Sequence, residues 1–289
     1  MKAAYYPGCS LHSTAVEYDQ STQAVLEALD VELEEVRDWN CCGATPAHAS
    51  DEYLAVALPL RNLAQVHSMG HSQLVVPCAA CYSATRTSQM EVKEGHQVAV
   101  DAHQDVKRIT SKDPSVDTQV LHPIEVLNQP EMLDRLEQRG AGALRGLRVA
   151  SYYGCLLVRP SGVVHFDDPE MPQSMDRIVS ALGGEPVNWS YKVDCCGATL
   201  ALARSEVVGR LVSRIVVGAR EAGADVIITA CPLCQSNLET RQDEEFPVFY
   251  FSELVGMALD LPGHTRWLKK HFIAFPSHIL AENRGDIDK

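Results

Sequence analysis

The cysteines of this chain occur in two sets of five, and both sets repeat one order. In each set a single cysteine is followed by an adjacent pair and then by a C-x-x-C unit, with no cysteine left over. The groups are separated by 31 and 35 residues in the first set and by 39 and 34 residues in the second. The ten residues are Cys9, Cys41, Cys42, Cys78, Cys81, Cys155, Cys195, Cys196, Cys231 and Cys234. This repetition predicts an internal duplication that spans the 289 residues.

The text around the cysteines repeats as well. The matching stretches are CCGAT at Cys41–Thr45 and Cys195–Thr199, YYPGC at Tyr5–Cys9 and YYGC at Tyr152–Cys155, and CAAC at Cys78–Cys81 and CPLC at Cys231–Cys234. A charged, glycine-containing stretch near Gly140–Gly146 separates the two copies. We therefore expect two domains, at residues 1–143 and 144–289.

Each cysteine group follows a segment with strand character. Leu74–Val76 and Val226–Thr229 are apolar runs that lead into the two C-x-x-C units. The other predicted strands are Ala3–Tyr6, Val31–Val36, Leu147–Tyr153 and Glu185–Trp189, and the predicted helices include Ala15–Leu29, Asp51–Met69, Met175–Leu182 and Val207–Ala222. This alternation predicts two α/β domains related by a pseudo-two-fold axis. Because the carboxyl ends of parallel strands share one edge, the five thiols of each set should converge there.

Composition limits where the protein works. The net charge is −13, from 25 basic and 38 acidic residues, and so acidic a surface repels nucleic acid. No apolar run reaches the length of a membrane span, and the amino terminus lacks the pattern of a signal peptide. We expect a cytoplasmic protein, in which the thiols are ligands or redox groups and not disulfides.

Iron–sulfur ligation is the chemistry that best explains five thiols per set, because soft thiolates favour such clusters. A closed zinc site takes four ligands, and a thioredoxin-like C-x-x-C needs neither an adjacent pair nor a duplication. Cysteines that merely fill the core would not occur in two ordered sets. Adjacent cysteines are awkward for a cubane cluster. A fifth thiolate implies bridging, an extra iron ligand or another cluster shape, and the spacing leaves these open.

Residues beside the cysteines supply weaker signals. The glycines Gly8, Gly43, Gly154 and Gly197 let the backbone approach a cluster and donate N–H bonds to sulfur, or else form plain turns. The aromatic residues Tyr5, Tyr6, Tyr152 and Tyr153 are typical of a core, with pocket lining as the alternative. Arg159 suits a surface ion pair or an anionic substrate, and His12 and His48 suit loop positions or proton donation.

Several longer stretches carry a family resemblance. They are RVASYYGCLLVRP (Arg148–Pro160), FDDPEMPQSMDRI (Phe166–Ile178), VDCCGA (Val193–Ala198), ACPLCQSNLETRQ (Ala230–Gln242) and PVFYFSELVGMALDL (Pro247–Leu261). The arrangement resembles the CCG cysteine-rich domain in two copies. Over nearly its full length the chain is similar to the B subunit of heterodisulfide reductase.

The resemblance implies an oxidoreductase that acts on a sulfur group. It implies a non-cubane [4Fe-4S] cluster in each half, with all five cysteines of a set as ligands, and no zinc, flavin or nucleotide in this chain. A disulfide held between the clusters would be cleaved, or thiols oxidised in reverse, with one electron from each cluster. Electrons would come from a ferredoxin-like iron–sulfur subunit, which a flavin subunit of the same complex supplies.

Two other functions stay open at this point. CCG proteins also serve as electron-transfer subunits in complexes that oxidise succinate, lactate or glycolate. A structural metal-binding module without redox chemistry is the third possibility, and it predicts a colourless zinc protein.

Overall fold

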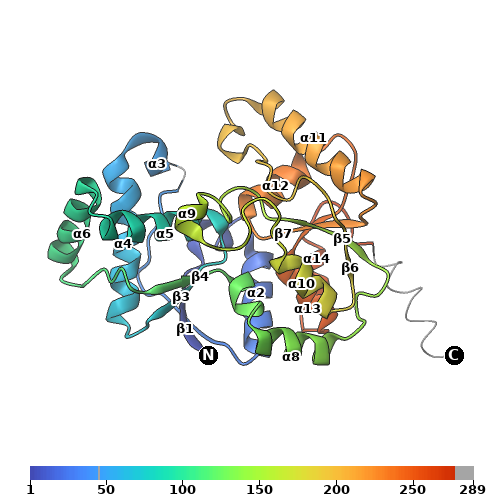
Figure 1. Ribbon diagram of the computed structural model, residues 1–289, viewed down its shortest axis with the longest axis horizontal. Helices are drawn as coiled ribbons and strands as arrows, with labels where there is room; N and C mark the ends of the chain where they lie inside the picture. Colours follow the sequence, from blue (N-terminus) through green and yellow to red (C-terminus); the bar gives the residue numbers. More distant parts are fainter. Residues whose placement is uncertain (45, 277–289) are drawn as a thin grey trace.

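The computed structural model describes residues 1–44 and 46–276, and these form two α/β units with the same plan (Figure 1). The strands of the first half are β1 (Lys2–Tyr5), β2 (Glu32–Glu35), β3 (Gln73–Val75) and β4 (Gln119–Leu121). Its helices are α1 (Gly8–Leu11), α2 (Val16–Ala28), α3 (Pro46–Ser50), α4 (Glu52–Ser68), α5 (Ala79–Lys93), α6 (Gln97–Thr110), α7 (Pro123–Leu127) and α8 (Pro130–Gly140).

The second half repeats the order of strands, but one helix joins its third and fourth strands where the first half has α5 and α6. Its strands are β5 (Arg148–Tyr152), β6 (Glu185–Pro186), β7 (Val226–Thr229) and β8 (Val248–Tyr250). Its helices are α9 (Ser161–Val164), α10 (Ser174–Ala181), the 3₁₀ turn η1 (Ala198–Leu200), α11 (Ser205–Glu221), α12 (Pro232–Thr240), α13 (Phe251–Ala258) and α14 (His264–Leu268).

Both sheets are wholly parallel and have equivalent strand orders, β2-β1-β3-β4 and β6-β5-β7-β8. The predicted duplicated α/β architecture is thus confirmed. The fourth strands, β4 and β8, were not expected from the sequence. Each has three residues and, unlike the equally short β3, is not followed by a cysteine group that would mark its end.

The strand order reverses direction at one place in each sheet, between β1 and β3 and between β5 and β7. Right-handed crossovers on either side of such a reversal place the connecting helices on opposite faces of the sheet. In the first half α2 faces the other half of the molecule, whereas α4 lies on the outer side, and α5 contacts α9 of the second half (Figure 1). Open parallel sheets bind ligands at the carboxyl ends of the strands beside this reversal.

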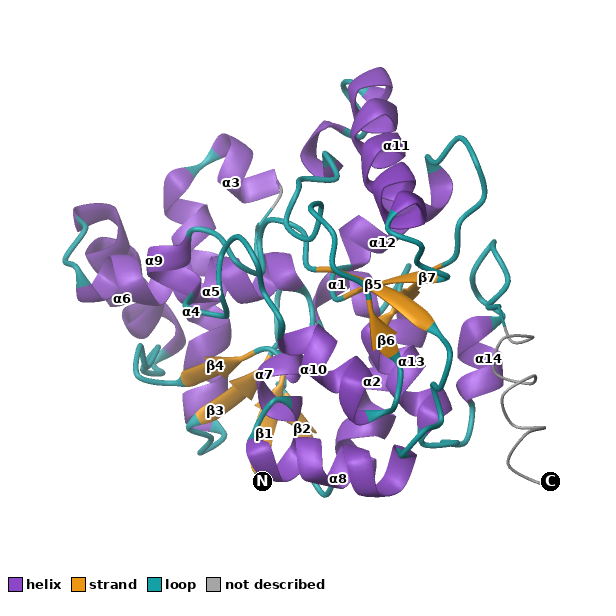
Figure 2. Ribbon diagram, turned by 45° about the vertical axis from the view of Figure 1, so that its right-hand side comes forward, coloured by secondary structure: helices purple, strands orange, loops and turns teal. Residues whose placement is uncertain are grey.

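The two halves pack through equivalent helices. Helix α2 of the first half contacts α13 of the second, and α10 of the second half contacts α7 of the first (Figure 2). The hydroxyls of Ser21 and Ser252 meet at 2.7 Å inside the α2–α13 contact, and both residues are buried. The interface is therefore a core shared by both halves, with the pseudo-two-fold relation that the sequence predicts.

The predicted division of the chain at residues 143 and 144 falls in the loop between α8 and β5. It stays a prediction, because α8 precedes this loop but packs against α10 of the second half. Within residues 1–44 and 46–276, no helix combines the length and apolarity that crossing a bilayer requires.

A buried ionic cluster attaches the last described segment to the second half. The Nε2 atom of His271 lies 2.8 Å from Glu253 Oε2, and its Nδ1 atom lies 3.4 Å from Glu239 Oε1. All three side chains are almost fully buried. Burial on its own lowers the pKa of His271, but the hydrogen bonds to both carboxylates outweigh it and raise that pKa to about 10. His271 is therefore a cation at neutral pH.

We expect this cluster to make stability depend on pH in the alkaline range. A histidine with a raised pKa stabilises the folded state fully below its unfolded pKa of about 6.5, and the contribution is lost as pH rises through about 10. The stability advantage of the wild type over His271→Gln, measured by urea unfolding, should therefore shrink from pH 7 to pH 10. The exposed His96→Gln should show no such trend. A wild-type advantage that stays constant over this range would contradict the ionic assignment.

Candidate metal centres

The cysteines of each set lie on three loops at the carboxyl edge of their sheet. In the first half Cys9 follows β1 within α1, the adjacent pair follows β2, and Cys78 caps the amino terminus of α5. The second half places Cys155, Cys195–Cys196 and Cys231 in the same order after β5, β6 and β7. The single cysteine and the C-x-x-C unit of each set thus flank the reversal of strand order, where a ligand site is expected.

In each set the second cysteine of the adjacent pair lies close to the second cysteine of the C-x-x-C unit. Cys42 Sγ lies 3.0 Å from Cys81 Sγ, and the equivalent distance from Cys196 to Cys234 is 3.6 Å. In the second half the single cysteine also joins, with Cys155 Sγ at 3.9 Å from Cys195 Sγ.

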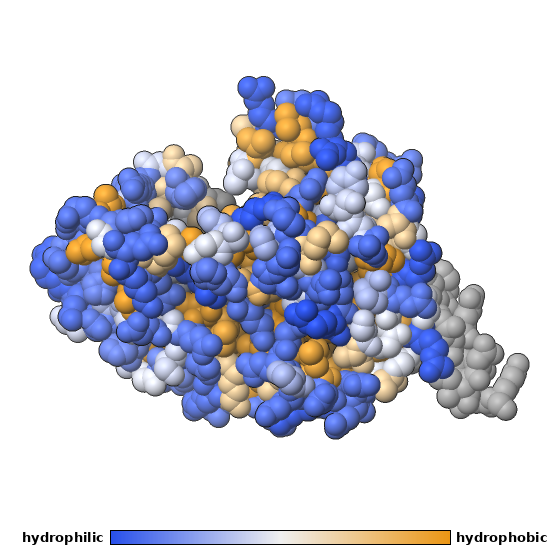
Figure 3. Space-filling model, viewed as in Figure 1, coloured by the Kyte–Doolittle hydropathy of each residue, from blue (hydrophilic) through white to orange (hydrophobic). Residues whose placement is uncertain are grey.

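Each set has a buried floor and an open rim. The C-x-x-C cysteines and the second cysteine of each adjacent pair are buried, whereas Cys9 and Cys195 are exposed. The adjacent-pair loops lead toward α3 and α11, and the surface is hollowed between the lobes that carry these helices (Figure 3). The rim thiols thus leave each set accessible from outside.

Close packing of thiols favours the thiolate form at some cysteines of each set and raises the pKa of the thiols that donate to them, Cys41, Cys81, Cys155 and Cys234. Hydrogen bonds from Cys41 and Cys81 lower the pKa of Cys42 to about 4, against the opposing effect of burial. A hydrogen bond from Cys155 lowers the pKa of Cys195 to about 6. Thiolates are the form of cysteine that binds metal.

Two glycines let the single-cysteine loop approach the C-x-x-C unit. Gly8 has φ +70°, and a Cβ atom there would lie 3.0 Å from Cys81 Sγ. Gly154 has φ +66°, and its Cβ would lie 2.9 Å from Cys234 Sγ. Any side chain at these positions would enter the space that the thiols surround.

The other two predicted glycines donate to sulfur. The N–H of Gly43 reaches Cys41 Sγ at 3.4 Å, and the N–H of Gly197 reaches Cys195 Sγ at 3.3 Å. Within residues 1–44 and 46–276, no three His, Cys, Asp or Glu side chains are arranged to bind one bare metal ion. The fit to a metal cluster therefore rests on the donor set, five thiols per half, and on the backbone around it.

A tyrosine hydroxyl holds each adjacent-pair loop. Tyr6 donates to the carbonyl of Asn40 at 2.8 Å, and Tyr152 donates to the carbonyl of Asp194 at 2.6 Å. Asn40 and Asp194 each precede the adjacent cysteines. Tyr6 is thus the structural equivalent of Tyr152, a pairing that the unequal stretches YYPGC and YYGC leave ambiguous. The repeated spacing Tyr-x-Gly-Cys is the signal that could have revealed it.

The remaining sequence candidates lie outside these contacts. Tyr5 and Tyr153 are buried in the core. Arg159 forms a surface ion pair with Glu170 at 2.7 Å. His12 packs edge-on against Trp39, with ring centroids 5.2 Å apart, and His48 is exposed.

Two residues that the sequence did not reveal join the sites of the two halves. Tyr18 Oη lies 2.9 Å from the carbonyl of Pro77 and 3.2 Å from that of Ala230, and these residues precede Cys78 and Cys231. His122 Nε2 lies 2.7 Å from the same Pro77 carbonyl. The two donors and the two carbonyls thus form one buried group on the axis between the halves. We call this the axial bridge: Tyr18, His122, Pro77 and Ala230.

The axial bridge fixes the state of His122. The N–H of Ile124 donates to His122 Nδ1 at 3.2 Å, so the ring hydrogen is on Nε2, where it points at Pro77. Burial lowers the pKa of His122 to about 3, although the hydrogen bonds to the two carbonyls act in the opposite direction. The imidazole is neutral at physiological pH.

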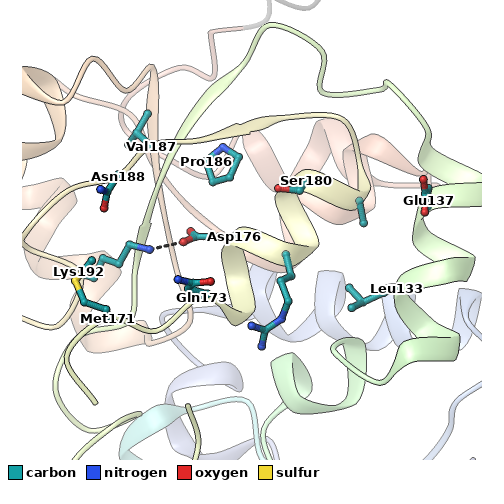
Figure 4. Close-up of a pocket in the computed structure, with 12 residues that line it drawn as sticks. Leu133, Glu137, Met171, Gln173, Asp176, Ser180, Pro186, Val187, Asn188 and Lys192 are labelled. Carbon is teal, nitrogen blue, oxygen red and sulfur yellow. Dashed lines mark hydrogen bonds and ion pairs between the residues drawn. The ribbon is translucent and has the colours of Figure 1, made fainter. Parts of the chain in front are cut away.

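A pocket of about 580 Å³ lies between α8, α10 and β6 (Figure 4). Lys192 is buried in its wall and forms an ion pair with Asp176. The backbone carbonyl of Lys192 accepts from the N–H groups of Tyr153 at 2.8 Å and Gly154 at 3.2 Å. The pocket wall thereby supports the Cys155 loop, and the described residues that line the pocket include no cysteine.

The fold defines a duplicated α/β protein with a set of five cysteines near the strand-order reversal of each half. The chain belongs to the CCG cysteine-rich domain family, whose model matches residues 3–86 and 149–239. Both copies predicted from the cysteine pattern are therefore confirmed.

Curated relatives match nearly the whole chain. One is the 8-methylmenaquinol:fumarate reductase membrane anchor subunit of Wolinella succinogenes, 28% identical over 93% of this chain and 96% of the relative. Another is the B subunit of the ferredoxin/F(420)H(2)-dependent CoB-CoM heterodisulfide reductase of Methanosarcina acetivorans, 27% identical over 89% of each chain. The similarity to the B subunit of heterodisulfide reductase inferred from the sequence is confirmed.

A solved structure agrees on the fold. A hypothetical protein from Helicobacter pylori superimposes with a TM-score of 0.71 at 11% identity and covers 94% of this chain. The present chain spans about half of that protein, 52% of its length.

Substitution of Gly8 tests the close approach of backbone to thiol. We expect Gly8→Ala to destabilise the protein by more than the roughly 1–2 kcal/mol of a left-handed alanine, because its Cβ also meets Cys81 Sγ. Gly70→Ala is the matched control, since Gly70 has φ +81° and nothing within 4 Å of its Cβ. The effect is measured as the change in unfolding free energy in urea and as the amount of metal bound by each variant. Equal losses in the two variants would show that the thiol contact imposes no constraint.

Removal of the Tyr18 hydroxyl tests the axial bridge. Tyr18→Phe leaves a buried carbonyl short of a donor, so we expect a loss of about 1–3 kcal/mol in unfolding free energy. Tyr53→Phe is the control, because its hydroxyl bonds to Asp105 near the surface and should cost less. Similar losses in both variants would contradict a structural role for the bridge.

Proposed function

We propose that this chain is the catalytic subunit of a heterodisulfide reductase-like complex, with a non-cubane [4Fe-4S] cluster on each five-cysteine set. The observation that carries the proposal is the geometry of the two sets. They occupy equivalent ends of two identical sheets, and the axial bridge joins the loops that bear Cys78 and Cys231. Two like redox sites are thus held on either side of one axis.

The donor set fits an iron–sulfur cluster better than zinc. Each half carries five cysteines on neighbouring segments at one edge of its sheet, whereas a closed zinc site takes four ligands. Soft thiolates favour iron–sulfur clusters, and N–H donation to cysteine sulfur, as from Gly43 and Gly197, is a common feature around them. Gly8 and Gly154 carry no Cβ atom, so the backbone of the single-cysteine loop can approach Cys81 Sγ and Cys234 Sγ closely, as backbone does around a cluster.

The duplication suits a two-electron reaction. Cleaving a disulfide to two thiols consumes two electrons and two protons. A cluster on each set would supply one electron to one substrate sulfur. The chain's own contribution is to hold both sets rigidly through the axial bridge and to leave the rim thiols Cys9 and Cys195 open toward the surface. The substrate class is a small-molecule or carrier-bound disulfide.

The proposed complex includes the source of electrons. A ferredoxin-like iron–sulfur subunit would deliver them, and a flavin subunit would in turn supply that protein. The relative from Methanosarcina acetivorans is itself named as one subunit of a larger reductase, which supports an assembly of several subunits for this chain.

A second candidate is an electron-transfer subunit of another oxidoreductase. The relative from Wolinella succinogenes favours it, because that protein is named as a subunit of a menaquinol:fumarate reductase and matches 93% of this chain. In this role the two clusters would pass electrons between partners without binding a disulfide.

Metal analysis and spectroscopy of anaerobically purified protein test the proposal. We expect about eight iron atoms per chain, from two four-iron clusters, and an electron paramagnetic resonance signal that changes when a thiol is added. Reduced viologen should drive disulfide cleavage by the complex. An iron–sulfur signal indifferent to thiols would favour the electron-transfer role, and a colourless zinc protein would refute both.

Half-site variants test whether the two sets are independent. We expect the double substitution Cys78→Ser and Cys81→Ser to remove about half of the iron, because it disrupts only the first set. The matching substitution of Cys231 and Cys234 should remove the other half. Loss of all the iron from either variant would indicate one shared centre instead of two.

A further inference from the structure

The two thiol sites are equivalent in most contacts but differ at one buried position. The third residue after the C-x-x-C unit is Ala84 in the first half and Asn237 in the second. Both lie on the helix that follows the unit, α5 and α12. Alanine has no hydrogen-bonding side chain, whereas the Asn237 amide is buried beside the second site.

The amide of Asn237 faces a cysteine of the second set. Its Nδ2 atom lies 3.3 Å from the carbonyl oxygen of Cys196 and 3.8 Å from Cys196 Sγ. Asn237 is 5% exposed, so water does not compete for these hydrogens. The second site thus has a side-chain N–H donor that the residue in the equivalent position of the first site cannot provide.

Arg241 fixes the orientation of this amide. Its Nε–H donates to Asn237 Oδ1 at 3.2 Å, and its Nη2 donates to the carbonyl of Ala201 at 3.2 Å. The oxygen of Asn237 therefore points at Arg241 and the nitrogen at Cys196. Ser88 occupies the equivalent position in the first half, so the orienting cation is also missing there.

Hydrogen bonds to cysteine sulfur change the reduction potential of an iron–sulfur cluster. Reduction adds negative charge that spreads onto the thiolates, and an N–H donor stabilises that charge. A donor present at one site only must therefore favour the reduced state of that site.

The other contacts around the two sites do not reverse this difference. The N–H donors Gly43 and Gly197 are matched. The residue before the adjacent cysteines is Asn40 in the first half, and its amide donates to the carbonyl oxygens of Cys41 at 2.8 Å and Leu58 at 3.1 Å, not to sulfur. In the second half this residue is Asp194, and a carboxylate opposes reduction. Asp194, however, is 40% exposed and paired with Arg214 at 3.4 Å, so solvent and the guanidinium screen its charge.

We propose that Asn237, held by Arg241, makes the cluster of the second half easier to reduce than that of the first. The proposal rests on the proposed function, since it requires a cluster on each set. One electron from the iron–sulfur partner protein then resides first at the second site, and a second electron is needed to reduce the first site. Asn237 and Arg241 are positioning residues, because they act through Cys196.

Redox titration followed by electron paramagnetic resonance tests the inference in the full chain. Half-site variants, with the C-x-x-C cysteines of one half replaced by serine, assign a midpoint potential to each site. We expect the second-half potential to be the higher. Asn237→Ala should lower it by a shift on the order of tenfold in the one-electron equilibrium, about 59 mV, and leave the first-half potential unchanged. Ser236→Ala, an exposed neighbour on α12, is the matched control and should change neither.

The variant Asn237→Ala could lose its second cluster. A second measurement therefore uses protein in which Asn237 is retained. In protein with only the second cluster, ¹⁵N-asparagine labelling should give a hyperfine coupling and an exchangeable proton coupled to the reduced cluster. The first-half cluster should lack a coupled amide proton, because the Asn40 amide donates to the carbonyl oxygens of Cys41 and Leu58 and not to sulfur.

The outcomes separate this inference from the proposed function. Clusters on both sets, with equal potentials or with a second-half potential that Asn237→Ala does not change, overturn the inference and leave the function standing. Absence of the amide coupling overturns it as well. Protein that binds no iron–sulfur cluster refutes both.

Discussion

Two backbone carbonyls without partners in their own sheets set the terms for the rest of the structure. The carbonyls of Pro77 and Ala230 lie at the ends of β3 and β7, just where the chain turns to present the C-x-x-C units. A buried carbonyl needs a donor, and Tyr18 and His122 supply one hydrogen each. Both donors belong to the first half, so the second half cannot complete its cysteine loop alone. Packing between the halves therefore also determines the geometry of the cysteine loops.

His122 donates its hydrogen bond to the Pro77 carbonyl as a neutral imidazole. A cationic imidazole on the axis would lie close to two thiolate-rich sites and would need its own compensation in the core. Burial instead keeps the pKa of His122 at about 3, so the ring contributes a hydrogen bond without a charge. The equivalent cap in the second half is Tyr250, which stacks on Tyr18 with ring centroids 4.2 Å apart. One half provides a donor at this position and the other a stacking surface.

The sequence predicted what depends on local pattern and missed what depends on packing. Strands next to the cysteine groups, the duplication and the convergence of thiols all follow from spacing and alternation. The strands β4 and β8 were missed because they are short and, unlike β3 and β7, lead into no cysteine group. Tyr18 and His122 were missed because each lies in a segment with no cysteine, and only tertiary packing brings both to Pro77 and brings Tyr18 to Ala230 of the second half. The equivalence of Tyr6 and Tyr152 could be established only from the strand register. In that register Pro7 is the equivalent of Tyr153.

The reciprocal contacts of α2 with α13 and α7 with α10 have a consequence for how such a protein can evolve. They are the contacts of an isologous dimer, in which one surface meets its own copy. A dimer of identical half-length chains would have the same residue at both equivalent positions, and its two centres would be alike. Joining the copies in one polypeptide removes that restriction, so asparagine can stand at position 237 while alanine stands at position 84. Fusion lets a symmetric scaffold carry two centres of different character.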